Sequence, residues 1–518
     1  MTLSTRAVGV GVPSSVVLHR VRLVPVAGRE PHPAAYAGTP VDLRIDDGVI
    51  TGVDSSISAE GCDWEYDAEG RWAIPGLWDH HVHLGQWGQT LQRVSLAGTR
   101  EPDDCLARVA AHVATLASSA PDSIVEGFGY RCALWQRPAR TAELDAVSAG
   151  HPVVLISGDA HNGWLNSRAQ QVLGVLAHDG LLRENEWFAV LSRLADLPGT
   201  QARHEAGYVE AVRQAARLGI VGVTDLEFAP NPRLWPARFA AGVTDIRVRC
   251  GVYPDQLDAV LAAGLRTGEP LDGDSRLTMG PLKIISDGSL NTRTAWCAQP
   301  YAHPDPDHPC GSANLDEAEL DTLLAAAHRG GLQVAVHAIG DAALAQAVGS
   351  LERTGATGSI EHAQLVDRAS TADLARLGVT ASVQPAHLLD DRDVIDRCWP
   401  DRADRCFALA DLTRAGVRVV LGSDAPVSPL DPWLAMASAV HRGQPSEPAW
   451  HPAQALTAAQ ALAASTDGQG TLGIGSLADI ALLDADPLPR GTSAEIASAL
   501  GTMRVSATFL AGRPTHLS

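Results

Sequence analysis

Eight short apolar runs alternate with helical segments through most of this chain of 518 residues. The apolar runs lie at 74–79, 219–225, 246–252, 281–286, 332–337, 359–362, 379–384 and 417–421. Segments rich in alanine, leucine and arginine lie between them, at 204–217, 315–329, 341–354, 369–377 and 408–415. Eight strands with intervening helices predict a closed (β/α)8 barrel. The competing fold is a doubly wound open sheet, but no Gly-x-Gly-x-x-Gly motif follows any of the runs.

Both ends of the chain are rich in strand-like sequence. Such runs lie at 16–23, 41–53 and 63–72 before the barrel region, and at 475–484 and 503–512 after it. We therefore expect a small β-sandwich domain built from both chain ends. The predicted domains are the N-terminal part of the sandwich at 1–70, the barrel at 71–464 and the C-terminal part of the sandwich at 465–518.

The connection between the first two barrel runs is far longer than an ordinary strand-to-helix loop. Residues 90–205 of this connection contain strand-like runs of their own at 122–129 and 152–157. This pattern predicts an insertion subdomain after the first barrel strand. A subdomain at this point of the chain would lie over the barrel mouth and select substrates.

The composition excludes several classes of protein. The formal net charge of −20, with no basic block to offset it, argues against nucleic-acid and anionic-membrane partners. No apolar run approaches the ~20 residues of a membrane span. The N-terminus lacks the apolar core of a secretory signal, and the eight cysteines form no Cys-x-x-Cys pair. We expect a cytoplasmic protein with free thiols.

Metal-competent side chains stand where the predicted strands end. His81 and His83 are two residues apart, so on a strand they point to the same side. The other strand ends carry His337, His362 and Asp424. A single such histidine is usually a hydrogen-bonded structural residue. Because the active sites of barrels lie at the carboxyl ends of their strands, however, the whole set predicts a divalent metal site.

Lys283 is unusual because it lies within an otherwise apolar strand. A buried ammonium group is costly unless it is paired or neutralised. One interpretation is that its side chain extends to the rim of the barrel. The other is that it belongs to the metal site.

Longer motifs surround these residues. They are Pro75-Gly76 followed by Asp79-x-His81-x-His83, and the segments 158–167, 280–295, 337–341, 360–364, 382–387, 422–427 and 475–479. Over nearly the whole chain they resemble the amidohydrolase superfamily. Within it they are similar to the amidohydrolase-3 group of YtcJ-like and N-substituted formamide deformylase-like proteins.

The resemblance implies a distorted (β/α)8 barrel with one or two divalent metals, which we expect to be zinc. It implies that His81 and His83 bind the more buried metal and that His337 and His362 bind the second. Asp424 would both bind the first metal and act as the base. Lys283, carboxylated by CO2, would bridge the two metals.

These expectations lead to a hydrolase that cleaves a non-peptide carbon–nitrogen bond with metal-activated water. Asp424 would take and return the proton, and His387 or His161 would stabilise the oxyanion. Half of the aromatic residues are tryptophan, which favours a small N-acyl or N-formyl substrate with an apolar or aromatic group. The predicted substrate-binding residues are His161, Trp164, Trp87, Trp135 and Arg293.

Three alternatives remain open from the sequence. The same scaffold suits a deaminase or a cyclic amide or ureide hydrolase. A catalytically silent metal-binding protein is the third alternative, although all six expected metal-site residues are present. The tryptophans are also compatible with a purely structural role in the core. Besides a small-molecule substrate, a second copy of the chain in a homodimer is the one partner that the sequence leaves open.

Overall fold

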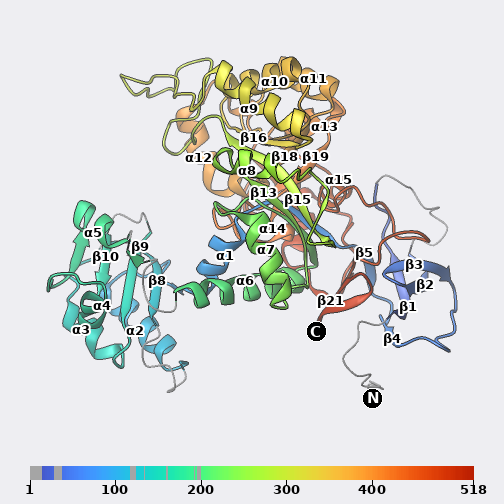
Figure 1. Ribbon diagram of the computed structural model, residues 1–518, viewed down its shortest axis with the longest axis horizontal. Helices are drawn as coiled ribbons and strands as arrows, with labels where there is room; N and C mark the ends of the chain where they lie inside the picture. The colour runs from blue at the N-terminus through green and yellow to red at the C-terminus, as the bar shows by residue number, and fades with distance from the viewer. Residues whose placement is uncertain are drawn as a thin grey trace. The chain divides into compact units, whose positions relative to one another are not determined.

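The computed structural model describes residues 14–27, 38–116, 124–132, 135–158, 162–191, 193–194 and 200–518 (Figure 1). The chain divides into two compact units. One unit consists of Met1–Leu84 and Val212–Ser518, and the other of Gly85–Ala211. In the described part of the chain, no helix is long and apolar enough to span a bilayer.

The larger unit contains a barrel of eight parallel strands that neighbour one another in chain order. They are β6 (Leu77–Val82), β12 (Ile220–Asp225), β13 (Arg247–Val252), β15 (Asp274–Ile285), β16 (Val334–Ala338), β17 (Gly358–His362), β18 (Thr380–Val383) and β19 (Val419–Leu421). Each of the eight predicted runs overlaps one of these strands, so the predicted barrel is confirmed. The described strands form no open doubly wound sheet.

The barrel closes between β6 and β19 through only a few contacts. A single bridge joins Val82 to Ala425. The amide of His83 donates to the carbonyl of Ala425 at 3.0 Å, and the amide of Asp424 donates to the carbonyl of His81 at 2.7 Å. The short strand β19 explains why this side is irregular. Three of the residues that close the barrel, His81, His83 and Asp424, are therefore also residues that the sequence predicts to bind metal.

Helices connect the barrel strands (Figure 1). They include α6 (Thr200–Arg217), α7 (Asn231–Ala240), α8 (Leu257–Ala262), α9 (Glu317–Gly330), α10 (Asp341–Thr354), α11 (Arg368–Leu377), α12 (Leu388–Cys398), α13 (Leu409–Arg414), α14 (Pro432–His441) and α15 (Ala458–Ala464). Their ends follow local sequence signals. The side chain of Asp316 accepts from the amide of Glu319 at the start of α9, and Gly331 ends that helix at φ 77°.

The two chain ends meet in one eight-stranded sheet, as expected of a β-domain made from both ends. Its strands are β1 (Ser15–Leu23), β2 (Pro40–Asp46), β3 (Val49–Asp54), β4 (Trp64–Asp67), β5 (Trp72–Pro75), β20 (Ile480–Leu483), β21 (Val505–Leu510) and β22 (Arg513–Leu517). Antiparallel pairing of β5 with β20 joins the N-terminal strands to the C-terminal ones. Leu18, Leu43 and Phe509 are fully buried in its core.

The smaller unit contains the predicted insertion and is an α/β unit with its own core. Its strands, in sheet order, are β11 (Leu181–Arg183), β10 (Asn162–Leu165), β9 (Val153–Ser157), β8 (Val125–Tyr130) and β7 (Val94–Ser95). Its helices are α1 (Leu84–Gln92), α2 (Pro102–Val113), α3 (Thr141–Val147), α4 (Ser167–Val172) and α5 (Glu184–Leu191).

Candidate metal centre

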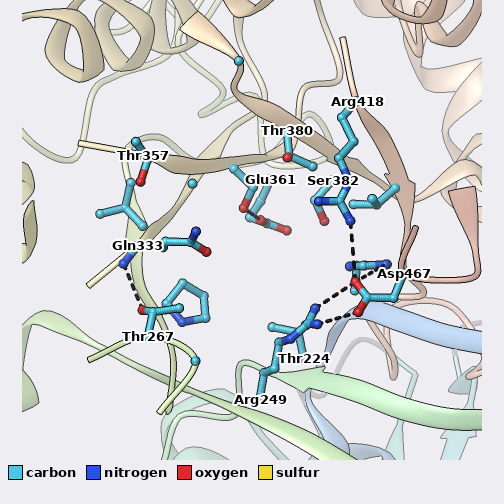
Figure 2. A pocket seen from close by; sticks show the side chains of 18 of the residues that line it. Thr224, Arg249, Thr267, Gln333, Thr357, Glu361, Thr380, Ser382, Arg418 and Asp467 are labelled. Atoms are coloured by element: carbon cyan, nitrogen blue, oxygen red, sulfur yellow. Dashed lines mark hydrogen bonds and ion pairs between the residues drawn. The ribbon is translucent and has the colours of Figure 1, made fainter. Parts of the chain in front are cut away.

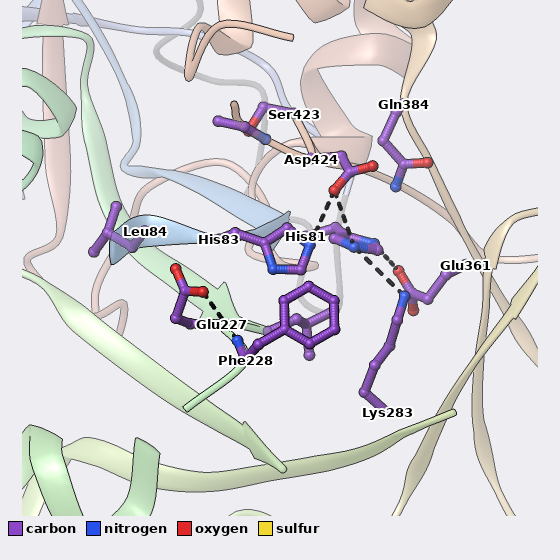
Figure 3. A network of polar contacts seen from close by, with 12 residues as sticks. His81, His83, Leu84, Glu227, Phe228, Lys283, Glu361, Gln384, Ser423 and Asp424 are labelled. Atoms are coloured by element: carbon purple, nitrogen blue, oxygen red, sulfur yellow. Dashed lines mark hydrogen bonds and ion pairs between the residues drawn. The ribbon is translucent and has the colours of Figure 1, made fainter. Parts of the chain in front are cut away.

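Three residues from distant parts of the chain bring their ligand atoms together at the carboxyl end of the barrel. One donor atom from each of His81, His362 and Asp424 lies within 4.8 Å of the others, and all three residues are buried. His81 comes from β6, His362 ends β17, and Asp424 follows β19. Figure 3 shows Asp424 pointing toward His81 and His83.

Two further predicted ligands adjoin this cluster. The Nε2 atom of His83 lies 3.2 Å from Oδ1 of Asp424, which is also 3.4 Å from Nε2 of His81. The ammonium nitrogen of Lys283 lies 3.5 Å from Nε2 of His81. The structure therefore brings together five of the six residues predicted to bind metal.

His337, the sixth, stands next to His362, with their ring centroids 4.5 Å apart. Its Nε2 atom lies 3.2 Å from the carbonyl oxygen of Gly288 and 3.3 Å from the carboxylate of Asp287. Asp287 is fully buried and also accepts hydrogen bonds from the amides of Ile339 and Gly340. These contacts fix the orientation of the His337 ring.

Glu361 orients His81 from the side opposite the cluster. Its Oε2 atom lies 2.7 Å from Nδ1 of His81, and both side chains are almost fully buried. Burial lowers the pKa of His81 to about 4, so its ring is neutral at pH 7. A neutral ring that donates its Nδ1 hydrogen to Glu361 presents the lone pair of Nε2 to the cluster.

The charge on Glu361 is itself stabilised. Burial alone would raise the pKa of this carboxyl, but the hydrogen bond with His81 and the electrostatic influence of His81 and Lys283 lower it to about 2. The hydroxyl of Ser359 also donates to Glu361. Glu361 is therefore an anion at neutral pH.

Asp79 ties the two sides of the barrel closure together. Its carboxylate accepts hydrogen bonds from the amide of His81 at 3.0 Å and from the amide of Ser423 at 3.1 Å. Burial raises the pKa of Asp79 to about 6. Asp79 thus supports the positions of His81 and Asp424 and does not point into the cluster.

Two residues of the cluster have unusual backbone conformations. His362 has a φ of 70° and Asp424 a φ of 54°, both in the left-handed region. Such a conformation costs about 1–3 kcal/mol in a residue with a side chain and is concentrated at functional sites. The hydrogen bond from the amide of Asp424 to His81 holds one of these strained positions in place.

The surroundings of Asp424 and Lys283 lower the pKa values of both side chains. Burial would raise the pKa of Asp424, but the surrounding rings of His81, His83, His362 and His387 hold it well below its usual range. Lys283 is 2% exposed, and burial lowers the pKa of its ammonium group. Asp424 is therefore ionised at neutral pH, while burial shifts Lys283 toward its neutral form.

These residues fit a divalent metal. The donor set of imidazole nitrogens and one carboxylate is typical of zinc. Buried polar atoms at the site also lack partners among the described residues, since Nδ1 of His83 and Nε2 of His387 accept and donate no hydrogen bond. Nε2 of His387 lies 3.9 Å from Oδ2 of Asp424. The site thus offers ligand atoms that no described protein group satisfies.

The residues predicted to bind substrate are placed differently. Trp164 is fully buried in the hydrophobic core of the smaller unit, where its ring centroid lies 6.0 Å from that of Trp135. Trp87 is 8% exposed in α1. Arg293 is exposed and donates to the carbonyl of His303. His161 lies outside the described residues. The geometry therefore gives Trp164 and Trp135 structural surroundings, and substrate contact by these residues stays a prediction.

Phe228 is a neighbour of the cluster that the sequence did not single out. It follows β12, is 60% exposed, and stacks on His83 with an interplanar angle of 8° and centroids 5.1 Å apart. Tyr253 stacks on its ring at 4.7 Å. No periodicity marks Phe228. Glu361, in contrast, was detectable as an acid inside a buried strand directly before His362.

Comparison with known proteins agrees with this geometry. The model of the amidohydrolase family matches residues 65–516. The putative amidohydrolase YtcJ of Bacillus subtilis is 26% identical, over 86% of this chain and 91% of its own length. The N-substituted formamide deformylase of Arthrobacter pascens is 23% identical, over 82% of this chain and 86% of its own.

A solved structure shows the same architecture. The crystal structure of an uncharacterized metal-dependent hydrolase from Pyrococcus horikoshii superposes with a TM-score of 0.74 at 26% identity, and it covers 92% of this chain and 99% of its own. The expected resemblance is therefore confirmed. This chain belongs to the amidohydrolase family and is a metal-dependent hydrolase.

Proposed function

We propose that this protein hydrolyses the carbon–nitrogen bond of a small non-peptide amide, an N-acyl or N-formyl amine with an apolar or aromatic group. One observation carries the proposal. The two carboxylate oxygens of Asp424 face different partners, because Oδ1 contacts His81 and His83 whereas Oδ2 lies toward His387. In the proposal, the first oxygen binds a metal and the second exchanges a proton.

In this proposal His81, His83, His337 and His362 hold one or two zinc ions together with Asp424. When bound, zinc lowers the pKa of water to about 7 and polarises a carbonyl oxygen. Asp424, ionised at neutral pH, accepts the proton of the attacking water and returns it to the leaving nitrogen. His387 contributes Nε2, which lacks a partner among the described residues, to the oxygen that becomes negatively charged.

Lys283 takes the role of a second anionic ligand after carboxylation. Its burial favours the neutral amine, which is the form that reacts with CO2. The 3.5 Å contact with His81 places its nitrogen beside the cluster. A carbamate at this position would remove the cost of burying a lysine charge, because nearby cations would stabilise the new anion.

The apolar part of the substrate is proposed to contact Phe228. An exposed aromatic ring beside a metal ligand offers a flat surface on which a planar group can stack. The name of the Arthrobacter relative, an N-substituted formamide deformylase, supports the choice of formyl and acyl amines as first candidates.

A metal-replete activity screen tests the proposal. N-formyl, N-acyl and cyclic amides would be incubated with zinc-loaded and chelator-treated protein, and release of amine, acid and ammonia would be measured. We expect turnover of linear N-formyl or N-acyl amines by the loaded protein alone. Ammonia release would instead indicate a deaminase, and ring opening a cyclic amide hydrolase. No turnover by fully loaded protein on any of these amides would refute the proposal.

A further inference from the structure

A polar chamber of about 480 Å³ lies within the barrel and is lined by residues of its strands and by residues just before several of them (Figure 2). All eight barrel strands contribute to its wall. Ser359 and Glu361 on β17 line the chamber and are two residues apart. Thr380 and Ser382 on β18 have the same spacing. This spacing identifies the inward face of each strand, so the chamber is the lumen of the barrel.

The sequence explains why this lumen is not filled. Barrels of this kind are usually packed with layers of bulky branched side chains. Here several inward positions carry small hydroxyl residues, namely Thr224, Ser359, Thr380 and Ser382. Their side chains leave a volume far above the ~30 Å³ that one water molecule takes up in the liquid.

Exposure decreases from one end of the chamber to the other. The wall residues Gln333 and Gly378, which lie just before β16 and β18, are exposed. At the inner end, Ser382 and Glu361 are each 2% exposed. The hydroxyl of Ser382 has no hydrogen-bond partner among the described residues. The chamber is therefore a passage from solvent to a buried polar floor.

The charged groups of the wall are paired with one another. Arg249 forms two contacts with Asp467, at 3.0 Å and 2.5 Å, and Arg418 lies 3.6 Å from the same carboxylate. Glu361 is paired with His81. A passage with balanced charges and many hydroxyls suits a small neutral molecule better than an ion.

The inner end of the chamber adjoins Lys283. Pro281 lines the chamber and lies two residues before Lys283 on β15, so both side chains are on the same face of that strand. Glu361 forms part of the floor and contacts His81, whose other ring nitrogen is 3.5 Å from the nitrogen of Lys283.

We propose that this chamber is the route by which carbon dioxide reaches Lys283 from the amino-terminal end of the barrel. The inference rests on the proposed carbamate of Lys283. The lone pair of the neutral amine attacks the carbon of CO2 and forms the nitrogen–carbon bond. One carbon–oxygen π pair moves onto oxygen, and the nitrogen loses a proton to solvent. The product is a carbamate anion, and no oxidant or reductant is needed.

The test narrows the chamber and measures labelling of Lys283. Protein stripped of metal and CO2 would receive zinc and carbon-13 bicarbonate, and the carbamate carbon would be followed by NMR over time. The double variant Thr380→Leu/Ser382→Leu fills two successive inward positions. Because barrels normally carry bulky residues there, we expect it to fold. The matched control, Thr380→Ser/Ser382→Ala, keeps the passage open.

We expect the Leu/Leu variant to take up label about tenfold more slowly, because a close-packed interior excludes small solutes, and to reach the wild-type plateau. The Ser/Ala control should label at the wild-type rate. Val420→Phe narrows the chamber from β19 and should also slow labelling. If the Leu/Leu variant does not fold, the labelling rate of Val420→Phe tests the route in its place. Unchanged rates in the folded narrowed variants overturn the route.

The labelling experiment also distinguishes failure of the proposed CO2 route from failure of the proposed hydrolase function. If the wild-type protein takes up no label although it binds zinc, Lys283 is not carboxylated and the route is refuted with it. The amide screen can still succeed in that case, because hydrolysis does not require the carbamate when one metal suffices.

Discussion

Oε2 of Glu361 lies 2.7 Å from Nδ1 of His81, although 280 residues separate the two in the chain. Partners of this kind fix the tautomer and the orientation of a metal-binding histidine, and their loss typically weakens metal binding about 10–100-fold. We therefore expect Glu361→Gln, which keeps the shape but removes the charge, to weaken zinc binding by a factor in that range. Competition with a chromophoric chelator measures the affinity.

Ser359→Ala is a milder variant that serves as the control for this prediction. It removes only one hydrogen bond to Glu361 and leaves the contact with His81 in place. It should therefore weaken zinc binding less than Glu361→Gln does. A Glu361→Gln protein with wild-type zinc affinity would show that Glu361 does not position His81.

Phe228 should act on the apolar part of the substrate. Removing its ring in Phe228→Ala is expected to raise KM for an aromatic N-acyl substrate about tenfold, because stacking and burial of a ring are together worth a few kcal/mol at most. KM for the corresponding N-formyl substrate without an aromatic group should change little, and zinc content should stay constant.

Phe128→Ala is the matched control for Phe228→Ala. It removes a ring that is 36% exposed on β8 of the smaller unit. Its KM values should equal those of the wild type. An equal rise of KM for both substrates in Phe228→Ala would argue against stacking and for a general disturbance of the site.

Much of this fold is predictable because its signals are local. Each barrel strand is a short apolar run bounded by turn or helix signals, and the eight predicted runs overlap the observed strands. The identity of the clustered residues is also predictable, because the carboxyl ends of parallel strands meet at one end of a barrel. For this reason the convergence of His81, His362 and Asp424 follows from their positions at strand ends.

Relations that depend on packing between distant segments could not be predicted. The contact of Glu361 with His81 depends on how β17 and β6 face each other across the barrel. The chamber depends on side-chain volumes summed over eight strands. The stacking of Phe228 on His83 depends on a loop conformation. Trp164 shows a different difficulty. A tryptophan near a motif looks the same in the sequence whether it lies in a core or in a binding site, and Trp164 lies in a core.

Asp225 should make the stability of the metal-free protein depend on pH. Burial, together with the nearby Glu227, raises its pKa from 3.8 to about 6. The folded state then holds the proton more tightly than the unfolded state. The free energy of unfolding is therefore largest below pH ~4 and falls as the pH rises through ~6, by a total of ~3 kcal/mol from this group.

Asp225→Asn removes this titration. The difference in unfolding free energy, variant minus wild type, should increase by ~3 kcal/mol as the pH rises from 4 to 8. Urea unfolding of both proteins at several pH values measures the difference, and contributions of other groups cancel in it. If the unfolding free energies of the two proteins differ by the same amount at every pH, Asp225 has the same pKa in the folded protein as in the unfolded chain, which contradicts the prediction.

Asp424 is the residue on which the proposed metal-dependent hydrolysis depends most, because it moves the proton. The most direct test of this role is the Asp424→Asn variant, assayed for zinc content and for turnover of the best substrate from the amide screen. We expect the variant to keep its zinc and to lose turnover by about 10²–10⁴-fold, the usual contribution of a general base. A zinc-loaded variant that turns over at the wild-type rate would contradict this role.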